Sequence, residues 1–183
     1  RIRRESSSGG VCKTLIIDSL KNGMVDGAYS LKCTDSFPFA QGEFYTREHI
    51  PSFGDMPNSV YHSVMACTEI DRIQPCKRLM LVGTACQLRA LNSIIKDKCD
   101  EVVRVCIFCK QQKTLDSTRF LAKMMGTSVP PNLKFRPRYR GDGWPGIVRV
   151  DGFELPYSRA AQIPFGKRLW TVPGCGICGD SFG

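Results

Sequence analysis

Cysteine is the residue type in this chain best able to do chemistry. The 183 residues include 10 Cys but only two His, which argues against imidazole-rich metal sites. Cys175 and Cys178 form a C-x-x-C motif flanked by Gly174 and Gly179. The glycines allow a tight turn, so both sulfurs can point the same way with backbone N–H groups beside them. Such a pair is typical of iron–sulfur, zinc or redox dithiol sites.

A second C-x-x-C motif, formed by Cys106 and Cys109, ends an apolar stretch. In a strand, residues three apart face opposite sides, so these two cysteines are not expected to bind one ligand together. Cys109, at the strand exit, is the better ligand candidate. Because one C-x-x-C pair does not complete a four-thiolate site, two more thiolates must come from elsewhere in the chain.

Cys86 lies where a predicted strand turns into a predicted helix. The apolar run 78–83 predicts a buried strand, Gly83 and Thr84 follow it, and residues 87–95 have a helical pattern. Ligands bind at the carboxyl ends of strands in open α/β sheets, and a helix N-terminus stabilises a thiolate. Cys86 is therefore a candidate ligand or nucleophile, although no His lies near it in sequence to act as its base.

The other cysteines allow plainer interpretations. A disulfide framework is disfavoured, because the chain is long enough to form a core and begins without an export signal. Buried, reduced thiols that pack as small hydrophobic groups are expected at six positions. These positions are Cys12, Cys33, Cys67, Cys76, Cys99 and Cys106.

The pattern of elements predicts an α/β fold with a mixed, mainly parallel sheet, flanking helices and an irregular Gly/Pro- and Cys-rich C-terminal segment. Residues 1–129 are expected to form the α/β core, and 130–183 a hairpin and C-x-x-C segment of the same domain. Because the chain starts without Met, we interpret it as a fragment. Helices are expected at 11–22, 58–73, 87–95 and 117–125, and strands at 24–31, near 44–45, at 78–83, 101–108, 147–150 and 153–155.

The order of these elements predicts that two cysteines converge. If strands 78–83 and 101–108 are parallel neighbours, Cys86 and Cys109 lie at the same edge of the sheet. We therefore group them with Cys175 and Cys178 as one ligand set for an inorganic centre.

The segment around Ser7, Ser8, Gly9 and Gly10 opens the first predicted helix. A Gly-rich loop at a helix N-terminus presents unpaired N–H groups to an anion such as phosphate. A plainly capped helix explains the same residues equally well.

Basic residues give the chain a net charge of +9, and Arg136, Arg138 and Arg140 alternate along one segment near Trp144. This segment is either a solvated face, a nucleic-acid site with stacking aromatics, or an anchor for a phosphorylated cofactor. The Ser-Gly loop favours the cofactor, and no nucleic-acid partner is expected. No apolar run approaches the roughly 20 residues that span a bilayer, so we expect a cytoplasmic protein without a membrane span.

Five motifs, in order, resemble the family of the beta subunit of coenzyme F420-reducing hydrogenase and its relatives. They are RESSSGG at 4–10, LVGTACQL at 81–88 (family VGTPCQ), IFC at 107–109 (LFC), RGDGWPG at 140–146 (a Gly-Trp loop) and GCGICGDSF at 174–182 (CxxCxDxF). Ala85 replaces the family's Pro, and the acidic stretch that follows the last motif in the family is not in this sequence.

The resemblance implies an iron–sulfur flavoprotein oxidoreductase that binds FAD and a 4Fe–4S cluster. Its substrate would be coenzyme F420 or another small-molecule, ferredoxin-linked acceptor, and its partners ferredoxin or hydrogenase/dehydrogenase subunits. The implied cluster ligands are Cys86, Cys109, Cys175 and Cys178. The implied flavin-binding residues are Ser7, Ser8, Gly9, Gly10, Thr84, Arg140, Gly143 and Trp144. The alternative is a non-catalytic adaptor module that zinc stabilises through the same cysteines.

Overall fold

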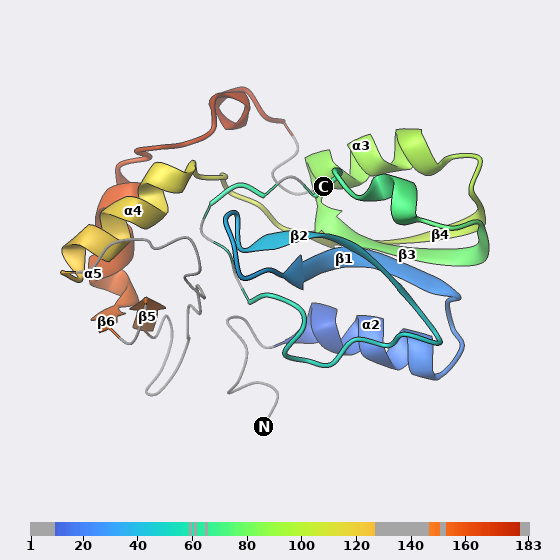
Figure 1. Cartoon of the computed structure of the whole chain (residues 1–183). Helices are drawn as coiled ribbons and strands as arrows, with labels where there is room; N and C mark the ends of the chain where they lie inside the picture. Colours follow the sequence, from blue (N-terminus) through green and yellow to red (C-terminus); the bar gives the residue numbers. More distant parts are fainter. Residues whose placement is uncertain are drawn as a thin grey trace.

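A four-stranded sheet organises the chain in the computed structural model, which describes residues 10–58, 60, 62–64, 66–126, 147–150 and 153–179. The strands are β1 (Gly27–Cys33), β2 (Ala40–Thr46), β3 (Cys76–Thr84) and β4 (Cys99–Ile107), in the order β2-β1-β3-β4. β1, β3 and β4 run parallel, and β2 is antiparallel to β1. Helices α2 (Val11–Lys21) and α3 (Ala85–Ile95) cover opposite faces of the sheet (Figure 1). The predicted α/β class is confirmed.

Side chains that alternate along the strands build a core on each face of the sheet. Ala28, Met80 and Val82 pack with Ile16 and Leu20 of α2 on one face. On the other face, the strand residues between them pack against α3 and the short 3₁₀ helix η1 (Ile70–Arg72). The middle of β3, 79–82, is buried on both faces and is continuously apolar, as expected for a central strand of a parallel sheet.

A second group of elements lies beyond one end of the sheet (Figure 1). It contains α4 (Leu115–Met124), the hairpin strands β5 (Ile147–Val150) and β6 (Phe153–Pro156), α5 (Tyr157–Ala161), the π-helix η2 (Gln162–Gly166) and the 3₁₀ helix η3 (Pro173–Gly176). The antiparallel pairing of β5 and β6 confirms the predicted hairpin, whose turn lies outside the described residues. The sequence interpretation missed α5 and η2. Among the described residues, no helix has the length and apolar character needed to cross a membrane.

Two expectations about residues 34–73 need correction. The predicted helix at 58–73 is wrong, because in the part that the structure describes only η1 is helical. Its backbone bonds to other segments instead: Ser63 N–H donates to the Lys113 carbonyl at 2.7 Å, and the Tyr29 hydroxyl donates to the Ala66 carbonyl at 2.6 Å. β2 is also a full seven-residue strand, in which Gly42 leaves room for Tyr29, since a Cβ there would collide with the Tyr29 hydroxyl.

Candidate functional site

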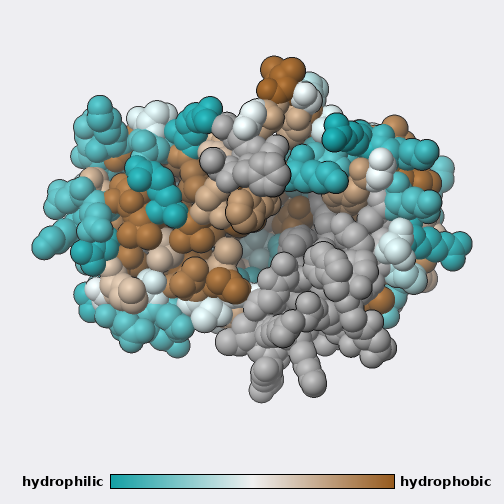
Figure 2. All heavy atoms as spheres, turned by 180° about the vertical axis from the view of Figure 1, so that it is seen from behind, coloured by the Kyte–Doolittle hydropathy of each residue, from teal (hydrophilic) through white to brown (hydrophobic). Residues whose placement is uncertain are grey.

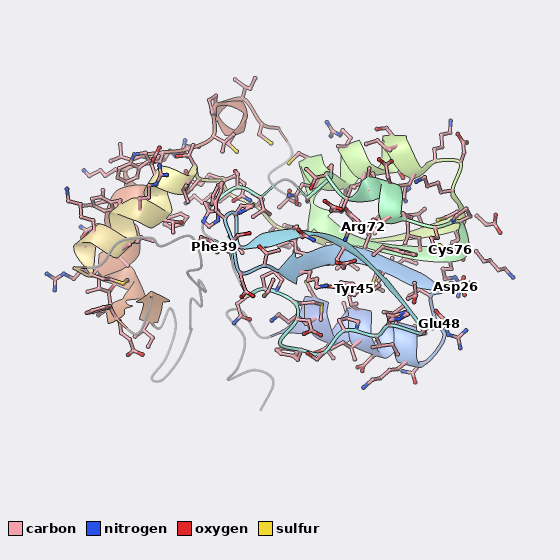
Figure 3. All side chains as sticks on the ribbon, viewed as in Figure 1. Asp26, Phe39, Tyr45, Glu48, Arg72 and Cys76 are labelled. Carbon is pink, nitrogen blue, oxygen red and sulfur yellow. The ribbon has the colours of Figure 1, made fainter. Side chains whose placement is uncertain are left out.

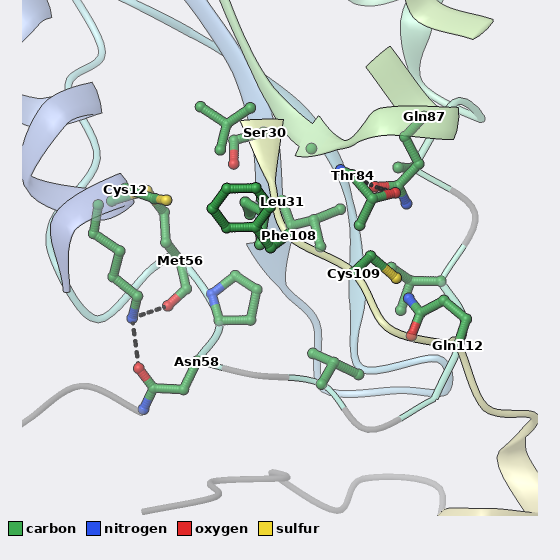
Figure 4. A pocket seen from close by; sticks show the side chains of 18 of the residues that line it. Cys12, Ser30, Leu31, Met56, Asn58, Thr84, Gln87, Phe108, Cys109 and Gln112 are labelled. Atoms are coloured by element: carbon green, nitrogen blue, oxygen red, sulfur yellow. Dashed lines mark hydrogen bonds between the residues drawn. The ribbon is translucent and has the colours of Figure 1, made fainter. Parts of the chain in front are cut away.

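A cavity of about 500 Å³ lies at the carboxyl ends of the parallel strands. Its walls come from the start of α2, the middle of β1, the end of β3 and the segment that leaves β4. Figure 4 looks into it, with Cys12 and Asn58 at one side and Thr84, Cys109 and Gln112 at the other. This position is where open α/β folds bind ligands, and the volume is typical of small-molecule and cofactor sites.

One wall begins at Gly10, which precedes α2 with φ 78°. This left-handed conformation favours glycine, which explains the residue type at the helix start. Three residues later, the Lys13 ammonium donates to the carbonyls of Phe53 (3.1 Å) and Met56 (2.7 Å) and to Asn58 Oδ1 (3.0 Å). Burial lowers the pKa of Lys13, and the nearby Cys33 opposes this shift. Lys13 therefore fastens the start of α2 to the loop on the cavity rim.

The opposite wall includes the turn from β3 into α3. Thr84 N–H donates to Gln87 Oε1 at 3.0 Å, which fixes the first turn of α3. The Thr84 hydroxyl lies 3.4 Å from Cys86 Sγ. This turn therefore holds the Cys86 thiol at the carboxyl end of β3, and Thr84 faces both the cavity and that thiol.

The segment that leaves β4 forms a short ladder with residues 170–172. Thr114 N–H donates to the Trp170 carbonyl at 2.8 Å, and Val172 N–H donates to the Gln112 carbonyl at 3.0 Å. Between them, the Lys113 side chain is only 1% exposed. Its ammonium donates to the Leu169 carbonyl, Thr171 Oγ1 and Gln111 Oε1 at 2.9–3.0 Å. Burial lowers the pKa of Lys113, as does Arg168, while Cys175 raises it.

This ladder brings the C-terminal C-x-x-C motif to the exit of β4. Cys175 follows the ladder directly, and its Sγ accepts the Gln112 N–H at 3.4 Å. Burial raises the pKa of the Cys109 thiol, and the neighbouring thiols of Cys175, Cys86 and Cys178 raise it further. Cys109 thus lies within electrostatic reach of the other three predicted ligands, although they come from different segments of the chain.

A fifth thiol, which the sequence interpretation placed among ordinary packing residues, lies near this group. Burial raises the pKa of Cys67, and the Cys86 thiol adds to this effect. Lys13 and Lys113 were also missed. A lysine three residues into a helix and another soon after a strand exit are too common in sequences to indicate a site.

The side chains as placed do not surround a single metal ion. Within the described ranges, no three His, Cys, Asp or Glu side chains are arranged to hold one. Zinc would need its sulfurs at about 2.3 Å from one point, closer together than the described thiols lie as placed. A 4Fe–4S cluster distributes four thiolates over four irons, so a looser group of four cysteines is the relevant arrangement for it.

Large apolar side chains are exposed beside these cysteines. Phe108 is 76% and Ile177 92% exposed. Figure 2 shows further hydrophobic surface over the half of the molecule that carries the sheet. Side chains of this size and exposure leave apolar area available for a bound molecule or a protein partner.

Several predicted residues cannot be placed in this site. Ser7, Ser8, Gly9, Arg140, Gly143 and Trp144 lie outside the described residues. No disulfide joins the ten cysteines, all of which are described. The expectation of six buried thiols is wrong for Cys33, at the end of β1, and Cys106, on the edge strand β4, because both are exposed. The other four are partly buried.

Comparison with known proteins shows a likeness in fold. No family model matches the chain, and no curated protein matches its sequence. The fold is similar to a chain of the xenon-derivatised F420-reducing [NiFe] hydrogenase complex from Methanosarcina barkeri, with a TM-score of 0.63 and 17% identity. The match covers 97% of this chain and 61% of that chain.

Proposed function

We propose that this chain is part of an iron–sulfur flavoprotein oxidoreductase. It would move electrons between a 4Fe–4S cluster, FAD and coenzyme F420 or another ferredoxin-linked acceptor. The observation that carries the proposal is the grouping of Cys86, Cys175 and Cys178 about Cys109 at the edge of a cavity. The likeness to a chain of an F420-reducing hydrogenase complex supports a redox role beside other subunits.

The four grouped cysteines would hold the cluster. Cys86 lies in the first turn of α3, Cys175 lies in η3, and Cys109 follows β4, so these three are outside the strand ladders of the sheet. Ligands on such segments can surround an inorganic core. The Gln112 N–H already donates to Cys175 Sγ, and bonds of this kind raise a cluster's reduction potential. Lys113 adds positive charge near Cys175 and so favours the anionic thiolate.

The cavity would hold the flavin. Tyr29, Leu31 and Val82 supply apolar surface for a flat ring system, and the N-terminus of α2 supplies N–H groups for phosphate. When bound, a flavin exchanges a hydride or single electrons, and so couples two-electron donors to one-electron centres.

The role of the protein is then to bind, orient and exclude water, rather than to supply an acid–base pair. His62 illustrates this, because it is fully buried and both ring nitrogens have partners: Thr118 Oγ1 and the Pro38 carbonyl, each at 2.8 Å. Burial lowers its pKa, so it remains a neutral structural residue.

The test is the cofactor content of protein purified without oxygen. We expect flavin absorption with a broad iron–sulfur shoulder, and iron by elemental analysis. Cys178→Ala should lose most of the iron while it retains flavin. Cys33→Ala is the matched control, because this exposed cysteine lies at the end of β1 and outside the proposed ligand set; it should keep both.

Two results would contradict the proposal. Wild-type iron content in Cys178→Ala would remove this cysteine from the ligand set. A colourless protein that contains about one zinc per chain and no flavin would support the adaptor instead.

A further inference from the structure

Two cysteines face each other at the opposite end of the sheet. Cys76 begins β3, Cys99 begins β4, and the two are direct partners in the parallel ladder. Their Sγ atoms lie 3.2 Å apart, although 23 positions separate them in sequence. Figure 3 shows Cys76 and Asp26 at the same end of the sheet. The strand pairing itself therefore holds the two thiols together.

This pair is separate from the cavity and its cysteines. β3 runs nine residues from Cys76 to Thr84, so at about 3.3 Å per residue roughly 26 Å separate its two ends. Cys76 and Cys99 are too distant to share a ligand with Cys86 or Cys109.

The pair is accessible to small molecules. Both cysteines are only partly buried, and they line a surface depression together with Lys77, Lys96 and Lys98. Asp97 and Asp100 also line it. Three ammonium groups around two thiols favour the approach of an anionic reagent.

We propose that Cys76 and Cys99 are a redox-modification site: a dithiol that an anionic low-molecular-weight disulfide, such as oxidised glutathione, converts to an intramolecular disulfide. Paired residues of neighbouring strands lie about 4.8 Å apart, which is within the Cα–Cα range of disulfides. The disulfide forms without any change in the register of the strands.

The chemistry balances as two thiol–disulfide exchanges. One cysteine thiolate attacks the reagent and releases a small thiolate, which leaves a mixed disulfide on the protein. The second cysteine attacks the protein sulfur of that mixed disulfide and releases a second small thiolate. The two protein thiols lose two electrons, which reduce the reagent, and their two protons pass to the released thiolates.

The surroundings of Cys76 indicate the order of attack. Burial raises the pKa of Cys76 to about 12, and its hydrogen bond with Cys99 and the charges of Cys99, Asp26 and Asp100 contribute. Cys76 therefore keeps its proton while Cys99 is reduced. Cys99 attacks the reagent first. Once Cys99 is a mixed disulfide, its charge no longer raises the pKa of Cys76, and Cys76 then attacks the sulfur of Cys99 to form the intramolecular disulfide.

Tryptic digestion makes the test direct. Cleavage after lysine and arginine yields peptides 73–77 and 99–104, and each contains one cysteine. Native protein is treated with oxidised glutathione, blocked with an alkylating agent and digested without reductant. We expect the linked 73–77/99–104 pair as the main disulfide, reversed by dithiothreitol. Cys76→Ser should accumulate glutathione on Cys99, and the matched control Cys33→Ser should form the link as the wild type does.

The proposal is overturned if the two peptides remain unlinked while exposed cysteines are oxidised. It is also overturned if linkage is no greater in native than in denatured protein, where the fold no longer brings the thiols together. A second readout needs no digestion: closing this loop should raise the Tm by about 5–10 °C. An unchanged Tm in protein that carries the link would contradict the native geometry, and Cys99→Ser should show no shift on oxidation.

Discussion

The two ends of the central sheet hold their cysteines in different ways. At the amino end, Cys76 and Cys99 lie within strands, and the ladder between β3 and β4 fixes their separation. At the carboxyl end, Cys86 lies in the first turn of α3, Cys109 follows β4 and Cys175 lies in η3, and side-chain and backbone bonds hold these segments in place. The same pair of strands thus supplies both ends, but only at the amino end are the two thiols direct partners in the β3–β4 ladder.

This difference separates two kinds of site. Thiols held by a ladder have one available partner, each other, and their chemistry is exchange between two sulfurs. Thiols outside the ladder, around a cavity, can adjust to a larger group, but their positions then depend on the residues that fasten these segments. Lys113 and Lys13 are the principal ties among the contacts described above, and their removal should affect the carboxyl end alone.

The largest effect is expected from Lys113→Met. Methionine fills similar space but leaves the Leu169 carbonyl and Thr171 Oγ1 without the charged donor. Loss of buried, charge-assisted hydrogen bonds should lower the free energy of unfolding by about 2–3 kcal/mol. Urea denaturation measures this change. Alkylation of Cys175 should accelerate, whereas alkylation of Cys76 should not.

Lys110→Met is the control for Lys113→Met, because Lys110 is exposed on the same segment. The pH dependence adds a second check. Burial lowers the pKa of Lys113 in the folded protein, whereas in the unfolded chain a lysine has its ordinary pKa of about 10.4. Between these two pKa values the unfolded chain binds more protons, so the stability of the folded protein rises with pH there. The advantage of wild type over Lys113→Met should therefore grow as the pH approaches the ordinary pKa of lysine from below. If Lys113→Met accelerated the alkylation of Cys76 as much as that of Cys175, the two ends of the sheet would not be independent.

A smaller effect is expected from Lys13→Met on the other wall of the cavity. Its ammonium is only partly buried, so the loss of its three hydrogen bonds should cost about 1 kcal/mol. Proteolysis or hydrogen exchange of residues 53–58 should report the loosened rim. Lys21→Met, at the far end of α2, is the control, and similar loosening in that variant would argue against a specific role for Lys13.

The sequence predicted the strands and helices that position the candidate site better than it predicted the contacts between distant segments. Apolar runs located β3 and β4, and the rule that sequential parallel strands are neighbours placed Cys86 and Cys109 at one edge. Periodicity also located α2, α3 and α4 to within a few residues. Each of these elements buries one face, so its apolar residues repeat at a regular spacing, and this spacing can be seen in the sequence.

The remainder depends on contacts between distant segments. Residues 62–73 have an apolar content that favours a helix, but they bond to Tyr29 and Lys113 instead. The ladder of residues 112–114 with 170–172 has no local sequence pattern, so the grouping of Cys175 with Cys109 was predicted without the contact that brings them together. The Cys76–Cys99 pair was overlooked, because strand register cannot be read from either segment alone.

The smallest structural change tests the amino end by itself. Cys99→Ala removes the hydrogen bond and the charge that help burial to raise the pKa of Cys76. The pKa of Cys76 should fall part of the way towards its ordinary value, so more thiolate is present at pH 9. Its alkylation by iodoacetamide should accelerate about three- to tenfold, since one pKa unit is a tenfold change in thiolate. Mass spectrometry of peptide 73–77 measures the rate.

Two controls separate this effect from general loosening. Asp100→Asn removes only a weaker contributor to the pKa of Cys76 and should accelerate alkylation less than Cys99→Ala does. Alkylation of Cys86 reports the carboxyl end and should be unchanged in both variants, because β3 separates it from Cys76. If Cys86 accelerates in parallel with Cys76, the substitution has disturbed the β3–β4 ladder itself, and the ladder does not isolate the amino-end pair from the cavity.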